Sequence, residues 1–132
     1  MSHKLVQVKD VLNNSFQMVD GRITVLEAMQ IAKENDCDAL IVKKRDEHDE
    51  FGLVLMSDIA KKVISKNKAP DRVNVYEIMA KPVISVSPEM DVRYCARLFE
   101  NFGLSKTPVI DGEDVIGMVG YEDIVLKGMT QE

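Results

Sequence analysis

Two aspartates, Asp58 and Asp123, are the residues whose type and repeated setting could do chemistry. Each is the seventh residue of a glycine-led segment, GLVLMSDI at 52–59 and GMVGYEDI at 117–124. An ionised carboxylate accepts hydrogen bonds and has no proton to donate. At the start of a predicted helix it either caps the exposed backbone N–H groups or contacts a ligand. The residues alone leave both interpretations open.

Catalytic and metal chemistry have little support. The sequence contains no Gly-x-Ser-x-Gly segment, no phosphate-binding P-loop and no dinucleotide fingerprint. No spacing of Asp, Cys or His sets a base beside a nucleophile. Cys37 and Cys95 lie among apolar residues and are expected to pack, and His3 and His48 have no carboxylate at ligand spacing. We therefore expect neither an enzyme nor a metal site, and no resident cofactor.

Composition favours a folded protein in water. The 132 residues are 45% hydrophobic and 30% charged, with a net charge of −5. An acidic chain without a basic stripe is a poor match for nucleic acid. No apolar run approaches the length of a membrane span, and the first ten residues lack the apolar core of a signal peptide. We expect a cytoplasmic protein.

The sequence contains an internal repeat. Four valines recur 67 residues later, and the glycine-led segment recurs 65 residues later: Val8, Val19, Val25 and Val42 match Val75, Val86, Val92 and Val109. The offset falls by two within KKRDEHDEF (43–51), which is longer than its counterpart IDGEDVI (110–116). Loops are where insertions are tolerated. The chain is therefore two diverged copies of one unit.

The two copies predict the same order of elements, β-α-β-β-α. The second copy predicts a strand at 83–87, a helix capped by Asp91 and ended by Gly103 with Val92, Cys95, Ala96 and Phe99 inside, a hairpin turning at Asp111-Gly112, and a last helix burying Ile124 and Val125. The first copy predicts a capping box of Thr24 and Glu27, a stripe of Val25, Ala28, Met29 and Ala32, two strands (ALIV and FGLVLM), and a helix from Ser57 or Asp58 that buries Ile59, Val63 and Ile64.

These elements predict an α/β (α+β) fold of two repeats, at residues 6–65 and 75–129, packed by pseudo-twofold symmetry. The polar segment 65–74, which contains Pro70, is the expected linker. A single repeat of about 60 residues buries too little surface to be stable alone, so we expect the two copies to pack against each other. A cleft at the repeat interface is expected, where ligands often bind.

At this point the chain resembles a tandem pair of cystathionine-β-synthase-type (CBS) domains, the Bateman module. The resemblance covers about residues 6–129 and rests on three repeated features. They are the first strand and helix with a small buried residue (Ala28, Cys95), the start of the next strand (Thr107-Pro108-Val109, degraded to Leu40-Ile41-Val42), and the two glycine-led segments. The resemblance implies a regulatory module that binds AMP, ADP, ATP or a related adenosyl compound and signals to a partner protein.

The resemblance also implies two candidate clefts. In this family the aspartate holds the ribose hydroxyls, and apolar residues of the other repeat lie against adenine. The first cleft would combine Ser57, Asp58 and Met79 with Ile84, Leu104, Ser105, Lys106 and Pro108. The second would combine Asp123 with Gln17, Cys37 and Asp38. Glu122 and Asp38 add negative charge there, so we expect the second site to be weak or empty.

One departure from the family pattern concerns phosphate. The Ser or Thr expected three residues before the aspartate is Leu55 in one copy and Gly120 in the other. Ser57 is a candidate substitute in the first copy only. The alternative function is therefore a structural or interaction module that has lost its ligand. In either case the resemblance implies a homodimer, through the two helix stripes with Leu98 and Phe102.

Overall fold

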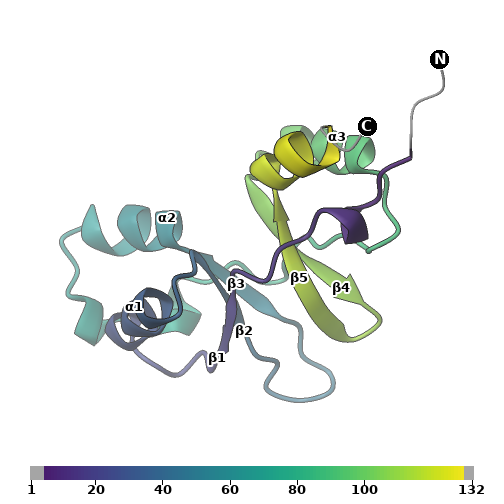
Figure 1. Ribbon diagram of the computed structural model, residues 1–132. Helices are drawn as coiled ribbons and strands as arrows, with labels where there is room; N and C mark the ends of the chain where they lie inside the picture. Colours follow the sequence, from purple (N-terminus) through teal and green to yellow (C-terminus); the bar gives the residue numbers. More distant parts are fainter. Residues whose placement is uncertain (1–4, 130–132) are drawn as a thin grey trace. The chain divides into compact units, whose positions relative to one another are not determined.

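The computed structural model describes residues 5–129 and divides the chain into two compact units (Figure 1). One unit comprises residues 15–83. The other combines the residues up to Asn14 with those from Ile84 onward. His3 lies outside the described residues. Mixed helices and strands in both units confirm the predicted α+β class.

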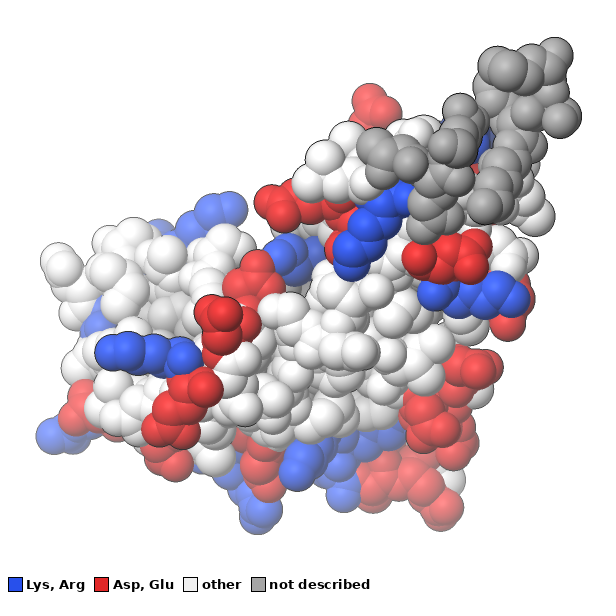
Figure 2. Space-filling view, viewed as in Figure 1, with Lys and Arg blue, Asp and Glu red and all other residues white. Residues whose placement is uncertain are grey.

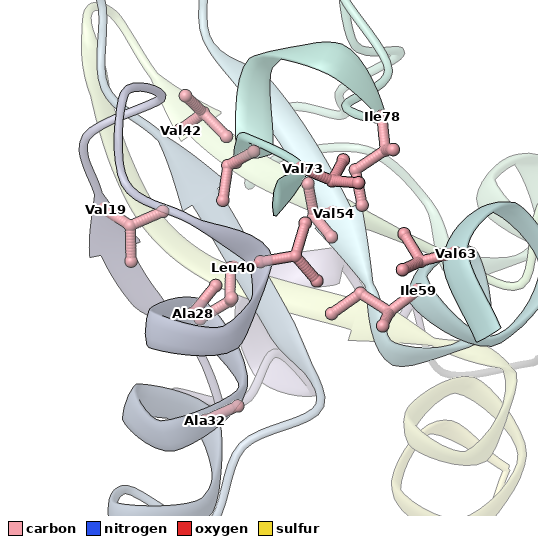
Figure 3. Packing of buried hydrophobic residues seen from close by; sticks show 12 residues of the cluster. Val19, Ala28, Ala32, Leu40, Val42, Val54, Ile59, Val63, Val73 and Ile78 are labelled. Atoms are coloured by element: carbon pink, nitrogen blue, oxygen red, sulfur yellow. The ribbon is translucent and has the colours of Figure 1, made fainter. Parts of the chain in front are cut away.

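The unit of residues 15–83 is a three-stranded sheet covered by helices. Its elements are β1 (Gln17–Val19), α1 (Val25–Glu34), β2 (Ala39–Val42), β3 (Gly52–Leu55) and α2 (Met56–Ile59), which continues as a π-helical segment, Ala60–Ile64. Two 3-10 helices, Pro70–Arg72 and Val75–Glu77, follow. Strand β2 lies in the middle, parallel to β1 and antiparallel to β3. Aliphatic side chains from the sheet, both helices and segment 73–78 converge into one core (Figure 3).

The other unit is built on the hairpin of β4 (Lys106–Asp111) and β5 (Asp114–Gly120). Helix α3 (Val92–Phe102) packs with a last helix that includes the π-helical segment Asp123–Gly128. A 3-10 helix, Val8–Asp10, comes from the start of the chain. The core joins Val6, Val8 and Val11 to Phe99 and its neighbours.

The first residues of each copy, 6–13 and 73–80, pack in the unit that contains the body of the other copy, and we call them the entry segments. The 3-10 helices Val8–Asp10 and Val75–Glu77 are equivalent at the 67-residue offset, and each packs in the unit that contains the body of the other copy. Backbone bridges fix both segments, since Asn13 pairs with Met118 and Ala80 pairs with Leu53. Each unit is therefore assembled from both sequence repeats. The limits 6–65 and 75–129 remain a prediction about the sequence repeat.

Several local predictions are confirmed. The Thr24 hydroxyl accepts the Glu27 N–H (3.1 Å), and the Glu27 carboxylate accepts the Thr24 N–H (3.4 Å), which completes the capping box of α1. The Asp91 carboxylate accepts the Arg93 N–H at the start of α3. Gly103 ends α3 in the left-handed conformation, with φ +65°, where a side chain would be strained.

The predicted strand at 83–87 is wrong beyond one residue. Only Val86 pairs with β4, by donating its N–H to the Pro108 carbonyl and accepting the Ile110 N–H. The equivalent strand β1 pairs over three residues. Pro108 stands where β2 has Ile41, and proline has no N–H to donate to the ladder. The loss of that donor shortens the pairing.

Two smaller predictions also need correction. The hairpin turns at Gly112-Glu113, one residue later than predicted, because Asp111 already pairs with Asp114. Ile64 and Val125, expected inside, are 51% and 54% exposed. Both lie in π-helical segments, whose wider turns carry residues off the face that a 3.6-residue period predicts.

Candidate functional site

Asp58 lies in the first turn of α2. Its Oδ2 accepts the Leu55 N–H at 2.8 Å, which reaches back to the residue that precedes the helix. The N–H of Leu55, the residue before the helix, has no intrahelical acceptor, so the aspartate satisfies it. Asp58 is half-buried and Ser57 is exposed. The carboxylate therefore serves as a cap and still reaches the surface.

Asp123 repeats this geometry with two additional donors. Its Oδ2 accepts the Gly120 N–H (2.9 Å) and the Asn13 side-chain amide (2.7 Å). Its Oδ1 forms an ion pair with Lys127 Nζ at 3.0 Å. Asp123 is only 9% exposed. Both oxygens of this carboxylate are engaged by the protein's own donors.

The difference between the two aspartates has a local cause. Ala80 is the second-copy residue equivalent to Asn13 and lies in the unit of Asp58, so no amide is offered there. Lys62 and Lys127 are equivalent at the 65-residue offset, and each donates to a carbonyl of an entry segment, Ile78 at 3.0 Å and Val11 at 3.2 Å. Sequence reasoning missed Asn13 and Lys127. The repeat alignment contained the signal, an Asn opposite an Ala.

The other second-copy candidates lie around β4. The Ser105 carbonyl accepts the Tyr121 N–H (3.4 Å), and Lys106 pairs with Gly120. Pro108 is buried in the hairpin, and Leu104 is half-buried against the core. Ile84 is 38% exposed. These residues share one unit with Asp123.

The remaining candidates lie in the unit of residues 15–83. Gln17 pairs with Leu40 in the sheet. The Asp38 carbonyl accepts the Met56 N–H at 3.1 Å, the counterpart of the contact between Ser105 and Tyr121. Met79 is half-buried and packs against the core. Each candidate cleft draws on residues of both units, so both clefts remain predictions.

The two cysteines behave as packing residues. Burial raises the pKa of the Cys95 thiol to about 11. Burial also raises the pKa of the Cys37 thiol, and the nearby carboxylates of Asp38 and Asp36 add to the effect. A thiol with a raised pKa is a poor nucleophile at neutral pH.

An apolar groove of about 610 Å³ lies between α1 and α2. Its lining residues include Leu26, Met29, Met56 and Ile64, and Cys37 is the one candidate residue among them. Ligand pockets usually combine apolar walls with a few placed polar groups. Its polar lining residues are Gln30, Lys33 and Asp36, and neither Asp58 nor Asp123 is part of it. The groove is therefore separate from the two repeated aspartates.

Acidic and basic side chains are interspersed over the visible face in Figure 2. Within residues 5–129, no cluster of three His, Cys, Asp or Glu is placed to hold a metal ion. No helix in the same range is long and apolar enough to span a membrane.

The repeated segments and the two α/β units define a tandem repeat protein, and comparisons agree. The model of the CBS domain matches residues 75–128. The CBS domain pair of the protein MJ0100, solved in complex with 5′-methylthioadenosine and S-adenosyl-L-methionine, is 30% identical with a TM-score of 0.75, over 90% of this chain and 96% of that one. The chain belongs to the CBS domain family, as a tandem CBS pair.

Two further relatives differ in what surrounds the pair. The hexameric CBS-CP12 protein from bloom-forming cyanobacteria is 36% identical with a TM-score of 0.90, over 93% of this chain and 68% of that one. Homoserine O-acetyltransferase of Methanosalsum zhilinae is 32% identical over 90% of this chain but only 23% of the enzyme. The chain spans 23% to 59% of the length of the first three curated relatives that it matches.

Proposed function

We propose that this CBS pair is a regulatory module that binds an adenosyl compound and transmits its occupancy to a partner protein. The observation that carries the proposal is Asp58, a half-buried carboxylate with a single backbone donor on Oδ2. A carboxylate so placed has acceptor capacity for the two vicinal hydroxyls of a ribose. The ligand-bound pair of MJ0100 supports the ligand class.

The chemistry of the segment before Asp58 favours a ligand without a phosphate chain. Leu55 and Gly120 occupy the places where a hydroxyl would support phosphate. S-adenosylmethionine and 5′-methylthioadenosine have a sulfur substituent instead, and both are bound in the relative. We propose that these compounds bind more tightly than AMP, ADP or ATP. Ser57, which is exposed, is the first-copy hydroxyl that would support a phosphate if AMP proved the better ligand.

Thermal unfolding with each compound tests this proposal. A ligand at about 100 times its dissociation constant adds about 2.7 kcal/mol to the free energy of unfolding. We expect 5′-methylthioadenosine and S-adenosylmethionine to raise the melting temperature more than AMP or ATP, with GTP as a control that leaves it unchanged. Asp58→Asn retains an acceptor for the Leu55 N–H and should lose the shift. Equal shifts in wild type and Asp58→Asn would remove Asp58 from the site.

A second candidate function is a structural pair that has lost its ligand. The caps favour it, because the two aspartates accept the Leu55 and Gly120 N–H groups and so have a role without any ligand. In that case no adenosyl compound at millimolar concentration changes the melting temperature. Asp58→Asn then leaves both stability and nucleotide response unchanged.

Both functions are proposed for a non-enzymatic, cytoplasmic homodimer. An apolar helix face is exposed on each unit. Leu26 and Ile64 flank the groove of one unit, and Tyr94, Phe102 and Leu126 are more than 60% exposed on the other. A second copy of the chain offers the same faces in return, so pairing by a twofold axis would cover both. The effector is proposed to lie in the partner chain or in sequence outside the pair.

A further inference from the structure

We propose that Asn13 is an internal stand-in for the ligand at Asp123, so that one aspartate of the pair is self-occupied and only Asp58 is available. The inference rests on the proposed function and assigns the difference in ligand binding between the two copies to one side chain. Asn13 is a positioning residue in this sense, because it acts through the carboxylate that it holds.

The geometry at Asp123 is that of a filled recognition site. The Asn13 amide donates to Oδ2 at 2.7 Å, the Gly120 N–H to the same oxygen at 2.9 Å, and Lys127 lies 3.0 Å from Oδ1. Asp123 as a whole is 9% exposed. A ribose would have to displace the amide before its hydroxyls could reach Oδ2. The gain from the new hydrogen bonds is then offset by the loss of one that already exists.

The backbone holds Asn13 firmly in place. Its N–H and carbonyl both bond to Met118, each at 2.8 Å. The segment before it is tied down as well, since Val8 donates to the Met90 carbonyl and Val92 donates to the Val6 carbonyl. Removal of the amide from Oδ2 therefore requires only the rotation of the Asn13 side chain, and the backbone of the entry segment remains docked.

The unit of residues 15–83 contains a natural control for Asn13. Ala80 makes the same reciprocal backbone pair, with Leu53, at 2.9 and 3.0 Å. An alanine is therefore compatible with this position and its bridge. Asp58, in the same unit as Ala80, is left with the Leu55 N–H as its donor on Oδ2. Exchange of the two residues should exchange the behaviour of the two aspartates.

The test counts binding sites per chain by calorimetry with 5′-methylthioadenosine. Wild type should bind one equivalent, Asn13→Ala two, and Ala80→Asn none. The double variant Asn13→Ala with Asp58→Asn should return to one, which Asp123→Asn then removes. Asn13→Ser is a second opening variant, and circular dichroism confirms the fold of each. Amide NMR adds a direct signal, because the Asn13 side-chain resonances of wild type should not move on titration.

Each result separates the inference from the proposed function. One site in wild type and still one in both Asn13 variants overturns the inference and leaves the function standing. Two sites in wild type, or a shift of the Asn13 amide with occupancy, also overturns it. No site in wild type but one in Asn13→Ala supports the inference and removes sensing by the natural chain. No binding in any variant overturns both.

Discussion

The sulfur of Met79 lies 2.6 Å from the place where a Cβ at Gly52 would stand. The same relationship occurs in the other unit, where Leu12 Cδ1 lies 2.8 Å from a Cβ built on Gly117. Met79 and Leu12 are equivalent at the 67-residue offset and belong to the exchanged entry segments. The leading glycine of each repeated segment is thus required by packing, because the entry segment presses on the strand at that residue.

Gly117→Ala should destabilise more than Gly52→Ala. The new methyl group at 52 meets the flexible end of Met79 at 2.6 Å and the Val42 Cβ at 3.1 Å, and both are side-chain atoms. At 117 it also meets the Asn13 carbonyl oxygen at 2.9 Å, a backbone atom that is held by Met118. Overpacking typically costs about 1–3 kcal/mol, and we expect the upper part of this range at 117. Urea denaturation measures both.

Gly128→Ala is the matched control for these two glycines. A Cβ there meets only ordinary contacts at 3.6 Å or more, and Gly128 lies in a helical segment. Alanine should leave stability unchanged or raise it by up to about 1 kcal/mol. If Gly128→Ala costs as much as Gly117→Ala, the entry segment is not the cause.

Thr107→Val should stabilise the protein. Thr107 is 1% exposed, and its Oγ1 has no hydrogen-bond partner among the described residues. A buried hydroxyl without a partner costs about 1–3 kcal/mol, and the first copy has the apolar Leu40 at the equivalent position. We expect a gain of about 1 kcal/mol in the free energy of unfolding. Thr107→Ser retains the hydroxyl, so a gain in that variant would contradict this explanation.

Much of the fold can be predicted from the sequence, because most local patterns that indicate a helix, strand or turn occur in both copies. The caps of Thr24 and Asp91 and the stop at Gly103 depend on neighbours within a few residues, so local patterns predict them. The exchange of entry segments is a long-range packing result that no local pattern encodes. The lost strand at 83–87 depends on Pro108, which is more than 20 residues away, and the self-occupied Asp123 depends on Asn13, 110 residues away.

Lys127→Met should cost more stability than Lys62→Met. Both lysines donate to a carbonyl of an entry segment, at 3.2 and 3.0 Å. Lys127 also balances the charge of Asp123, whose side chain is 11% exposed. A nearly buried carboxylate left without its cation is unfavourable. We expect a loss of about 0.5–1.5 kcal/mol for Lys62→Met and about 1–2 kcal/mol more for Lys127→Met, measured by urea denaturation. Equal losses would show that the ion pair contributes nothing.

Asp49→Asn should weaken the acid dependence of stability. Lys81 and Arg45 both bind this carboxylate, whose side chain is 6% exposed, and they hold its pKa below the ordinary value of 3.8. A lowered pKa stabilises the fold at pH values above about 4, and that stabilisation is lost as the pH falls toward the folded pKa. The variant should melt lower at pH 7 and lose less between pH 5 and pH 3.

Asp46→Asn is the control on the same loop. Asp46 accepts the His48 N–H at 2.8 Å and is exposed. Thermal melts at several pH values should show an acid dependence like that of wild type. If Asp46→Asn and Asp49→Asn behave alike, the effect belongs to the loop's charge as a whole and not to the contact with Lys81.

Phe102→Glu should shift the proposed homodimer to monomer. Phe102 is 61% exposed at the end of α3, and a charge buried in an apolar contact between two copies is strongly unfavourable. Sedimentation at micromolar concentration should give the dimer mass for wild type and the monomer mass for the variant. Tyr76→Glu, at a residue 54% exposed outside these helices, should remain dimeric. A monomeric wild type would contradict the proposed dimer, and a monomeric Tyr76→Glu would place the contact elsewhere. The melting temperature adds an independent check, since it rises with protein concentration only where folding and association are linked.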